Sequence, residues 1–176
     1  MLNLSASTTI NRPVELVFDK LANDFEHTYP QYASLNFSIE KITEGPVAVG
    51  SRFIEKAPKY GRQEVNFKKK GEGKRIELGP LEPDLQREII EQVIEVTGYD
   101  LNRSFSIKMS QPEGTGFLVF KFKKAGEGTA LTLLAQLNLT GSKPLQRFIY
   151  RLLLALFGPK SFKEMLEKIK GLVEAA

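Results

Sequence analysis

Two side chains are the best candidates for acid–base chemistry, the single histidine His27 and the glutamate Glu55. Glu55 follows Phe53 by two positions in "SRFIEK", and side chains two apart on a strand point to the same face. If Phe53 points into a core, Glu55 does too, and burial would raise the pKa of its carboxyl. The alternative is exposure at the end of the strand. His27 is either a general base at a pocket rim or, as its polar surroundings favour, a solvent-exposed histidine.

Composition restricts the other kinds of catalytic chemistry. The 176 residues contain no cysteine and one histidine, which excludes disulfides, thiolate sites and a multi-histidine metal site within one chain. No G-x-S-x-G nucleophile motif occurs, and the two "GEG" stretches are typical of turns, not of a phosphate-binding loop. We therefore expect no metal and no cofactor. The residues favour a non-enzymatic protein without excluding an enzyme.

A basic cluster in "KKKGEGKR" carries much of the excess charge of a chain whose net charge is +4. Its simplest interpretation is a solubilising loop tip. A transient contact with an anionic membrane is the functional alternative. Contact with an RNA backbone, with Phe67 stacking on a base, is a remoter one, and we do not expect nucleic acid as a partner. The cluster consists of Lys68, Lys69, Lys70, Lys74 and Arg75.

Alternation of apolar and polar residues predicts the sheet that must position these groups. A first strand covers 2–10, two more follow in "NFSIEKITEG" and "SRFIEK", and four successive segments between 87 and 140 alternate in the same way. Short turns join these four, which favours an antiparallel meander, and no strand is followed by a crossover helix. The segment 58–86 contains "QEVNFK" and "RIELG" around a "GEG" turn and is predicted to form an inserted basic hairpin.

Two short helices are predicted directly after the first strand. Asn11 is the expected cap of the first helix, and Pro13 suits its opening turn. The second helix, around 25–32, is expected to be interrupted at Pro30 because proline lacks the backbone donor that a helix interior uses.

The closing segment, "LQRFIYRLLLALFGPKSFKEMLEKIKGLVEAA", predicts a long amphipathic helix with Ser142 as its cap and Pro144 in its first turn. Its longest nearly uncharged run contains Arg151, whereas a membrane-spanning helix needs about 20 apolar residues. We expect the helix to pack on the sheet, with a membrane-surface helix as the alternative. Pro159 predicts a kink or a break.

One helix cannot fill a strongly curved sheet along its whole length. Either large side chains fill the gap or a cavity opens there, and the sequence leaves both possibilities open. The inward faces are mostly apolar with few polar groups, as in small-molecule pockets. The predicted ligand-binding residues are Phe53, Gln92, Ile94, Phe105, Ile107, Met109, Leu118, Phe120, Phe122, Leu133, Leu137, Phe148, Leu152 and Leu156.

Four motifs and their order carry a resemblance: "INRPVELVFDKLAN", "VGSRF", "EQVIEVTGYDLNRSFSIK" and "GEGTALTLLAQLNLTG", the last before a helix ending in "LEKIKGLVEA". The chain resembles the START-like (SRPBCC) helix-grip superfamily, and most of all its polyketide cyclase/dehydrase and lipid-transport group. The likeness covers nearly all of the chain except roughly 58–86. It implies one α+β domain over 1–176, whose seven-stranded curved antiparallel sheet wraps around the C-terminal helix.

The same resemblance implies a hydrophobic pocket between sheet and helix that binds a lipid, an isoprenoid, a polyketide or an aromatic molecule. We expect a carrier or sensor of such a ligand, and a cyclase/dehydrase-like enzyme using the same cavity is the alternative. The N-terminus lacks the basic start and apolar run of a secretory signal, so a cytoplasmic location is expected. The sequence leaves the oligomeric state open.

Overall fold

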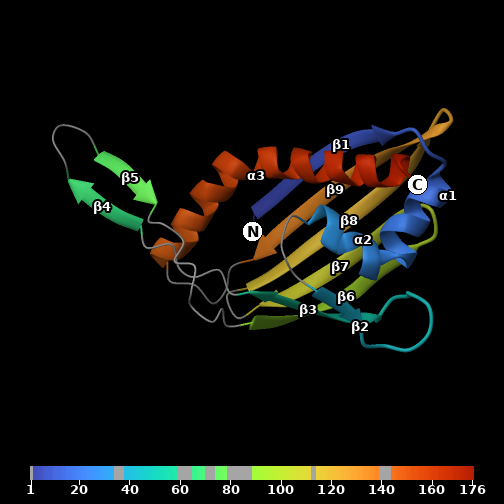
Figure 1. The fold of residues 1–176 in the computed structure, drawn as a ribbon, viewed down its shortest axis with the longest axis horizontal. Coiled ribbons are helices and arrows are strands. Elements are labelled where there is room, and N and C mark those ends of the chain that lie inside the picture. The colour runs from blue at the N-terminus through green and yellow to red at the C-terminus, as the bar shows by residue number, and fades with distance from the viewer. Residues whose placement is uncertain are drawn as a thin grey trace.

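An antiparallel sheet with helices on one face forms the body of the protein (Figure 1). The computed structural model describes the backbone of residues 2–33, 38–58, 65–69, 74–78, 89–111, 114–138 and 144–176. It describes the side chains of residues 3–33, 38–56, 91–110, 114–138 and 158–176.

The sheet has seven strands in the order β1-β9-β8-β7-β6-β3-β2. All neighbouring strands pair antiparallel. The first strand of the chain, β1, pairs with the last, β9. The predicted α+β architecture is confirmed, including the meander of the last four strands. The strands are β1 (Leu2–Ile10), β2 (Ser38–Lys41), β3 (Arg52–Pro58), β6 (Ile89–Asp100), β7 (Ser104–Gln111), β8 (Gly114–Ala125) and β9 (Gly128–Asn138).

Burial alternates along the strands as the sequence pattern predicts. On β6, Ile94 and Val96 are fully buried, whereas Val93, which directly precedes Ile94, is 43% exposed. Side chains on a strand point alternately to the two faces, so one face of the sheet receives nearly all of the large apolar groups. This inner face is the one that the helices cover (Figure 1).

The first helix starts later than the sequence predicts. Helix α1 spans Val14–Phe18, and its N-cap residue is Pro13, with a ψ of 148°. The prediction of Asn11 as the cap is wrong because the Pro13 carbonyl accepts the first helical hydrogen bond, from Val17 N at 3.1 Å. The backbone N–H of Asn11 instead donates to Glu174 Oε1 at 2.7 Å.

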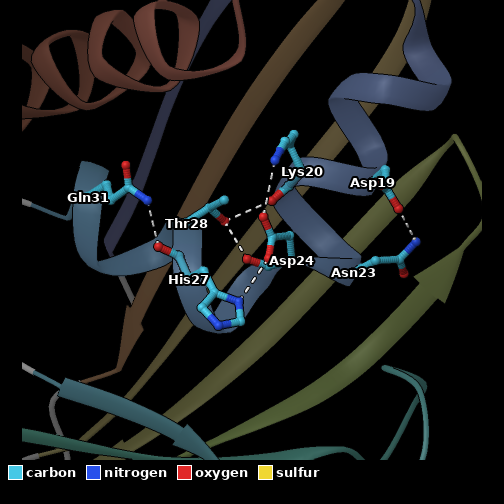
Figure 2. Close-up of polar contacts among 7 residues, drawn as sticks. All are labelled: Asp19, Lys20, Asn23, Asp24, His27, Thr28 and Gln31. Atoms are coloured by element: carbon cyan, nitrogen blue, oxygen red, sulfur yellow. Dashed lines mark hydrogen bonds and ion pairs between the residues drawn. The ribbon is translucent and has the colours of Figure 1, made fainter. Parts of the chain in front are cut away.

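A π-helical turn, η1 (Asp19–Asn23), joins α1 to helix α2 (Phe25–Tyr32). Asp24 N donates to the Asp19 carbonyl at 2.9 Å, which is the i→i−5 bond of a π-turn. In a regular α-helix, Asp24 N would donate to the carbonyl of Lys20. Here that carbonyl instead accepts from the buried hydroxyl of Thr28 at 2.7 Å (Figure 2). Thr28 thereby fixes the angle between the two helical segments.

Helix α2 runs through Pro30, so the predicted interruption is wrong. Proline removes only its own N–H, whose partner would be the Glu26 carbonyl, and the helix ends soon afterwards at Tyr32. The turn that follows Pro30 keeps its own bond, from Ala33 N to the Tyr29 carbonyl at 3.1 Å.

Helix α3 (Pro144–Glu174) starts at the proline expected in its first turn and includes Pro159 in its interior. Figure 1 shows this helix changing direction part-way along, which is the kink that a proline predicts. At Gly158 the helix comes close to β1, because a Cβ added there would lie 2.8 Å from Leu4 Cδ1. Its second half buries the predicted apolar stripe of Phe162, Leu166, Ile169 and Val173.

The C-terminal end of α3 is tied to the loop after β1. The Arg12 guanidinium donates to the carbonyl of Glu174, whose side chain accepts from Asn11 N at 2.7 Å. Thr129 Oγ1 in turn donates to the Arg12 carbonyl at 2.8 Å. These bonds fasten the second half of α3 to the sheet at both β1 and β9.

Strands β4 (Val65–Lys69) and β5 (Lys74–Leu78) pair only with each other and form a separate two-stranded sheet. Their antiparallel pairing agrees with the predicted hairpin, and Figure 1 draws it beyond the end of the large sheet. The rest of the predicted insertion at 58–86, including Lys70, lies outside the described residues except for Pro58 at the end of β3.

Candidate functional site

The inner face of the sheet has one end that is filled by aromatic rings, which we call the packed end. Phe105, Phe120 and Phe122 project from β7 and β8, and helices α1 and α2 supply Phe18 and Phe25. Ring centroids lie 5.2 Å apart for Phe18 and Phe122 and 5.5 Å apart for Phe25 and Phe105, at steep interplanar angles. Such edge-to-face contacts add to the stability from burial, so this end is a solid core.

The other end of the inner face, which we call the polar end, is lined by smaller or less buried residues. The ladder register places Leu137, Gly116 and Met109 side by side on β9, β8 and β7. Leu137 and Met109 are partly exposed, whereas Leu133 and Ile107 further along the same strands are fully buried. The backbone of α3 before Gly158 continues from Leu4 toward this end (Figure 1).

The polar end takes its name from a buried pair, Glu55 on β3 and Gln92 on β6. The two residues are direct cross-strand partners, and Gln92 Nε2 donates to Glu55 Oε2 at 3.0 Å. Glu55 is 6% exposed and Gln92 is 8% exposed. Desolvation by burial raises the pKa of Glu55, and the Gln92 hydrogen bond offsets part of that rise. Of the two orientations open from the sequence, the structure therefore has Glu55 pointing inward beside Phe53.

Tyr29 of α2 lies close enough to this pair for the charge of Glu55 to act on its phenol. Its hydroxyl donates to Met109 Sδ at 3.7 Å, and its ring stacks on Phe25 with centroids 4.7 Å apart. Burial raises the pKa of the Tyr29 phenol, and the charge of Glu55 raises it further. Tyr29 thus stays protonated and connects the packed end to the polar end.

Tyr32, one helical turn after Tyr29, carries a buried hydroxyl with no hydrogen-bond partner in the described part of the chain. Its ring is fully buried and lies edge-on to Tyr29 at 5.5 Å and to Phe120 at 6.4 Å. Burial raises the pKa of this phenol well above its usual value, and Tyr29 adds to the rise. An unsatisfied buried hydroxyl costs about 1–3 kcal/mol, so its retention needs an explanation.

The structure brings most of the predicted ligand-binding residues to the inner face. The fully or nearly fully buried ones are Phe53, Gln92, Ile94, Phe105, Ile107, Leu118, Phe120, Phe122 and Leu133. Met109 and Leu137 are partly exposed at the polar end. Phe148, Leu152 and Leu156 lie in the first half of α3, and their side chains are outside the described residues.

His27 lies away from this face. Its imidazole is 77% exposed, and its Nδ1 lies 2.9 Å from Asp24 Oδ1. Asp24 also accepts from Lys20 Nζ at 3.3 Å, so His27 belongs to a polar cluster on the outside of the helical turn (Figure 2). Phe25, Thr28, Tyr29 and Tyr32 are the buried residues of α2, and His27 is on its opposite side.

Four residues of the basic cluster lie on the β4–β5 hairpin. The register places Lys68 opposite Arg75 and Lys69 opposite Lys74. The pairing therefore gathers four basic residues on one hairpin.

Sequence reasoning missed Tyr29, Tyr32 and Gly116 as members of the site. The two tyrosines occur three apart in "EHTYPQY", a spacing that puts them on one side of a helix, but the expected interruption at Pro30 hid this. Gly116 is the third residue of β8, and no local signal in the sequence marks it.

Among the described residues, no three histidine, cysteine, aspartate or glutamate side chains gather as metal ligands would. None of the helices that the structure describes has the length and the apolar character needed to cross a bilayer.

The sheet order, the short helices after β1 and the C-terminal helix on the concave face define the helix-grip, or Bet v 1-like, fold. Solved structures with this arrangement match almost the whole chain. The crystal structure of Ara h 8.0201 has a TM-score of 0.62 at 14% identity and covers 99% of each chain. The protein TTHA0849 from Thermus thermophilus has a TM-score of 0.65 at 17% identity, covering 99% of this chain and 98% of its own.

A third similar structure is NE0264 from Nitrosomonas europaea, with a TM-score of 0.61 at 14% identity, covering 99% of this chain and 95% of its own. At these identities the likeness is one of fold. No protein-family model matches the sequence, and no curated protein matches it significantly.

Proposed function

We propose that this protein binds a small hydrophobic molecule between the sheet and helix α3, as a carrier or sensor. The observation that carries the proposal is the contrast along the inner face. Aromatic rings fill the packed end, whereas Gly116 and Ala135 leave little side-chain volume on β8 and β9 toward the polar end. A concave, mostly apolar surface with a few converging polar groups is what a small-molecule site requires.

The unpartnered hydroxyl of Tyr32 supports the same proposal. It is buried beside Tyr29 and Phe120, and none of the described residues forms a hydrogen bond with it. A bound molecule with one polar atom near Phe120 would remove this cost. The apolar ligand classes that the resemblance to START-like proteins implies, lipids, isoprenoids, polyketides and aromatic molecules, all fit such a surface.

The proposal is tested by filling the space above the polar end. Ala135 points inward on β9, next to Leu118 on β8 and Leu4 on β1. We expect Ala135→Phe to weaken binding of an environment-sensitive apolar dye at least tenfold, because the added ring occupies the site. Native mass spectrometry of the gently purified wild type should show a copurified small molecule that the variant lacks.

The matched control is Gln136→Phe, which adds the same ring at the neighbouring, outward-facing position. It should leave dye binding and copurification unchanged. Thermal unfolding of both variants separates a blocked site from a lost fold. Equal dye binding by wild type and by a folded Ala135→Phe variant would contradict the proposal.

An enzyme that uses the same cavity, of the polyketide cyclase/dehydrase kind, is the second candidate. Glu55 favours it, because a buried carboxyl with a raised pKa can exchange a proton with a bound molecule. We expect such an enzyme to change the molecule that copurifies with a Glu55→Gln variant when wild-type protein is added. Recovery of the molecule chemically unchanged would leave only the carrier or sensor.

We further propose a transient contact between the hairpin tip and an anionic membrane, from which an apolar ligand would be collected. The register that sets Lys68 opposite Arg75 and Lys69 opposite Lys74 supports it, since it brings four basic residues together on one hairpin. Each basic residue near such a surface contributes about 1 kcal/mol. Glutamate in place of Lys68 and Lys69 should abolish sedimentation with phosphatidylserine vesicles at low salt, with thermal stability unchanged. If wild-type protein does not sediment with these vesicles, the cluster is only a solubilising turn.

A cytoplasmic location and a single domain over 1–176 remain predictions consistent with this proposal.

A further inference from the structure

The buried Glu55–Gln92 pair has an unusual hydrogen-bond balance. In the described part of the chain, the Glu55 carboxylate receives one hydrogen bond, from Gln92 Nε2 to Oε2 at 3.0 Å. It forms no ion pair with any described lysine, arginine or histidine. An ionised carboxylate can accept about four hydrogen bonds, and a buried one is costly without a partner.

The nearest groups do not supply that partner. The residues two positions away along the same strands and face, Phe53 and Ile94, are fully buried and apolar. The Tyr29 hydroxyl lies within electrostatic reach of Glu55 but donates to Met109 Sδ at 3.7 Å. Among the described residues, therefore, none donates to the second carboxylate oxygen, and we take it as the acceptor for a donor that enters from the polar end.

We propose that the Glu55–Gln92 pair is the head-group anchor of the site, and that it selects apolar molecules ending in a hydrogen-bond donor, a hydroxyl or an ammonium group. This inference rests on the proposed binding function and adds the chemistry of the ligand to it. The apolar body would lie along Met109, Gly116 and Leu137, which the register places in one row with Ile94, two positions from Gln92 on the same face.

The charge of the pair excludes the opposite kind of ligand. A carboxylate or phosphate head placed against Glu55 would face a like charge in a poorly hydrated environment, which disfavours its binding. A donor head instead completes the hydrogen bonds of Glu55, and an ammonium head also neutralises it. The site is thus the reverse of a fatty-acid site, in which a cation would hold the head group.

The test compares three probes with equal chains, decylamine, decan-1-ol and decanoate, by displacement of a bound apolar dye at pH 7. Any apolar site disfavours a charged head, so the decisive comparison is between the two charged probes. We expect wild-type protein to bind decylamine at least tenfold more tightly than decanoate. Tight binding of decanol as well would show that a neutral donor suffices, and weak binding of decanol would assign the anchor to amines.

Variants connect the preference to the pair. Glu55→Gln keeps a hydrogen-bond acceptor but removes the charge. It should therefore weaken the binding of decylamine at least tenfold and change the binding of decanol little. The double variant Glu55→Leu with Gln92→Leu removes both polar groups of the pair, and it should weaken the binding of decylamine while strengthening the binding of decanoate. Glu91→Gln is the control, because Glu91 is exposed next to Gln92 and pairs with Lys56 at 3.5 Å.

These measurements distinguish a failure of the head-group anchor from a failure of the proposed binding function. If decylamine and decanoate bind equally and Glu55→Gln changes neither, the anchor is overturned while the binding site stands. If none of the three probes displaces the dye, and the dye itself binds Ala135→Phe as it binds the wild type, the proposed binding function fails. Circular dichroism of each variant confirms that the fold is intact before either conclusion is drawn.

Discussion

The packed end and the polar end share the same strands and differ in almost every other respect. Phe105 on β7 is fully buried among aromatic rings, whereas Met109, four residues along the same strand and face, is partly exposed. At the packed end α1, α2 and the second half of α3 all cover the sheet, and the bonds of Arg12 and Glu174 fasten α3 there. Toward the polar end, Tyr29 of α2 reaches Met109, and the backbone of the first half of α3 continues in this direction (Figure 1).

This difference shows how one sheet can serve stability and binding at once. Stability requires close packing, and close packing leaves no space for a ligand. A site must instead keep space for the ligand and retain polar groups that the described residues do not fully satisfy, such as the Glu55 carboxylate and the Tyr32 hydroxyl. The aromatic core of the packed end compensates for the lower stability of the polar end.

The largest effect is expected from truncation at the packed end. Phe105→Ala should lower the free energy of unfolding by about 3–5 kcal/mol, because it opens a cavity among rings that cannot collapse. Met109→Ala should cost less than about 2 kcal/mol, because Met109 already borders accessible space. Urea denaturation measures both, with Phe105→Leu as a milder substitute if the alanine variant does not fold. Equal losses at the two positions would contradict the division of the inner face.

The next largest effect concerns the two tyrosines of α2. Tyr32→Phe removes a buried hydroxyl without a partner in the described part of the chain and should raise the free energy of unfolding by about 1 kcal/mol. Tyr29→Phe removes a hydroxyl that donates to Met109 Sδ and should give no gain. The same Tyr32→Phe variant should bind its copurified molecule less tightly. A loss of stability on Tyr32→Phe would mean that the hydroxyl already has a partner.

A smaller effect tests the close contact between α3 and β1. Gly171→Ala has open space around it and should stabilise the helix by about 0.5–1 kcal/mol. Gly158→Ala should lose that gain, because its Cβ would lie 2.8 Å from Leu4 Cδ1 and 3.3 Å from Cδ2. Combining Gly158→Ala with Leu4→Ala should remove the clash, which a double-mutant cycle of unfolding free energies would show as coupling. Additive effects would show that the helix does not approach β1 at this point.

The smallest effect is the dependence of stability on pH at the polar end. Because burial raises the folded-state pKa of Glu55 above its ordinary value of 4.5, the folded state holds the proton more tightly than the unfolded state. The Glu55 contribution to stability is therefore fully present below pH 4.5 and is lost as the pH rises through the higher folded-state pKa. Melting temperatures of wild type and Glu55→Gln should diverge in favour of the variant from pH 4.5 upward. Glu91→Gln, on the exposed side of the same ladder, should show no such divergence.

Local patterns in the sequence determined the elements of this fold and the faces that they bury. Alternation along 2–10 and through the four final strands predicted which residues point inward, because side-chain direction on a strand depends only on position. The apolar stripe from Phe162 to Val173 and the first-turn proline of α3 were likewise local signals that the structure confirms. The inward direction of Glu55 was one of two possibilities that the sequence left open, and the burial of Glu55 in the structure decides between them.

Only the tertiary structure decided what those faces meet. The Gln92–Glu55 bond joins residues 37 positions apart and depends on the register between β3 and β6. The π-turn that sets the angle of α2, the passage of that helix through Pro30 and the capping role of Pro13 arise where the chain packs against the sheet and against Glu174. The physical reason is that periodicity is a property of neighbours in the chain. Register, close approach and unsatisfied burial are properties of neighbours in space.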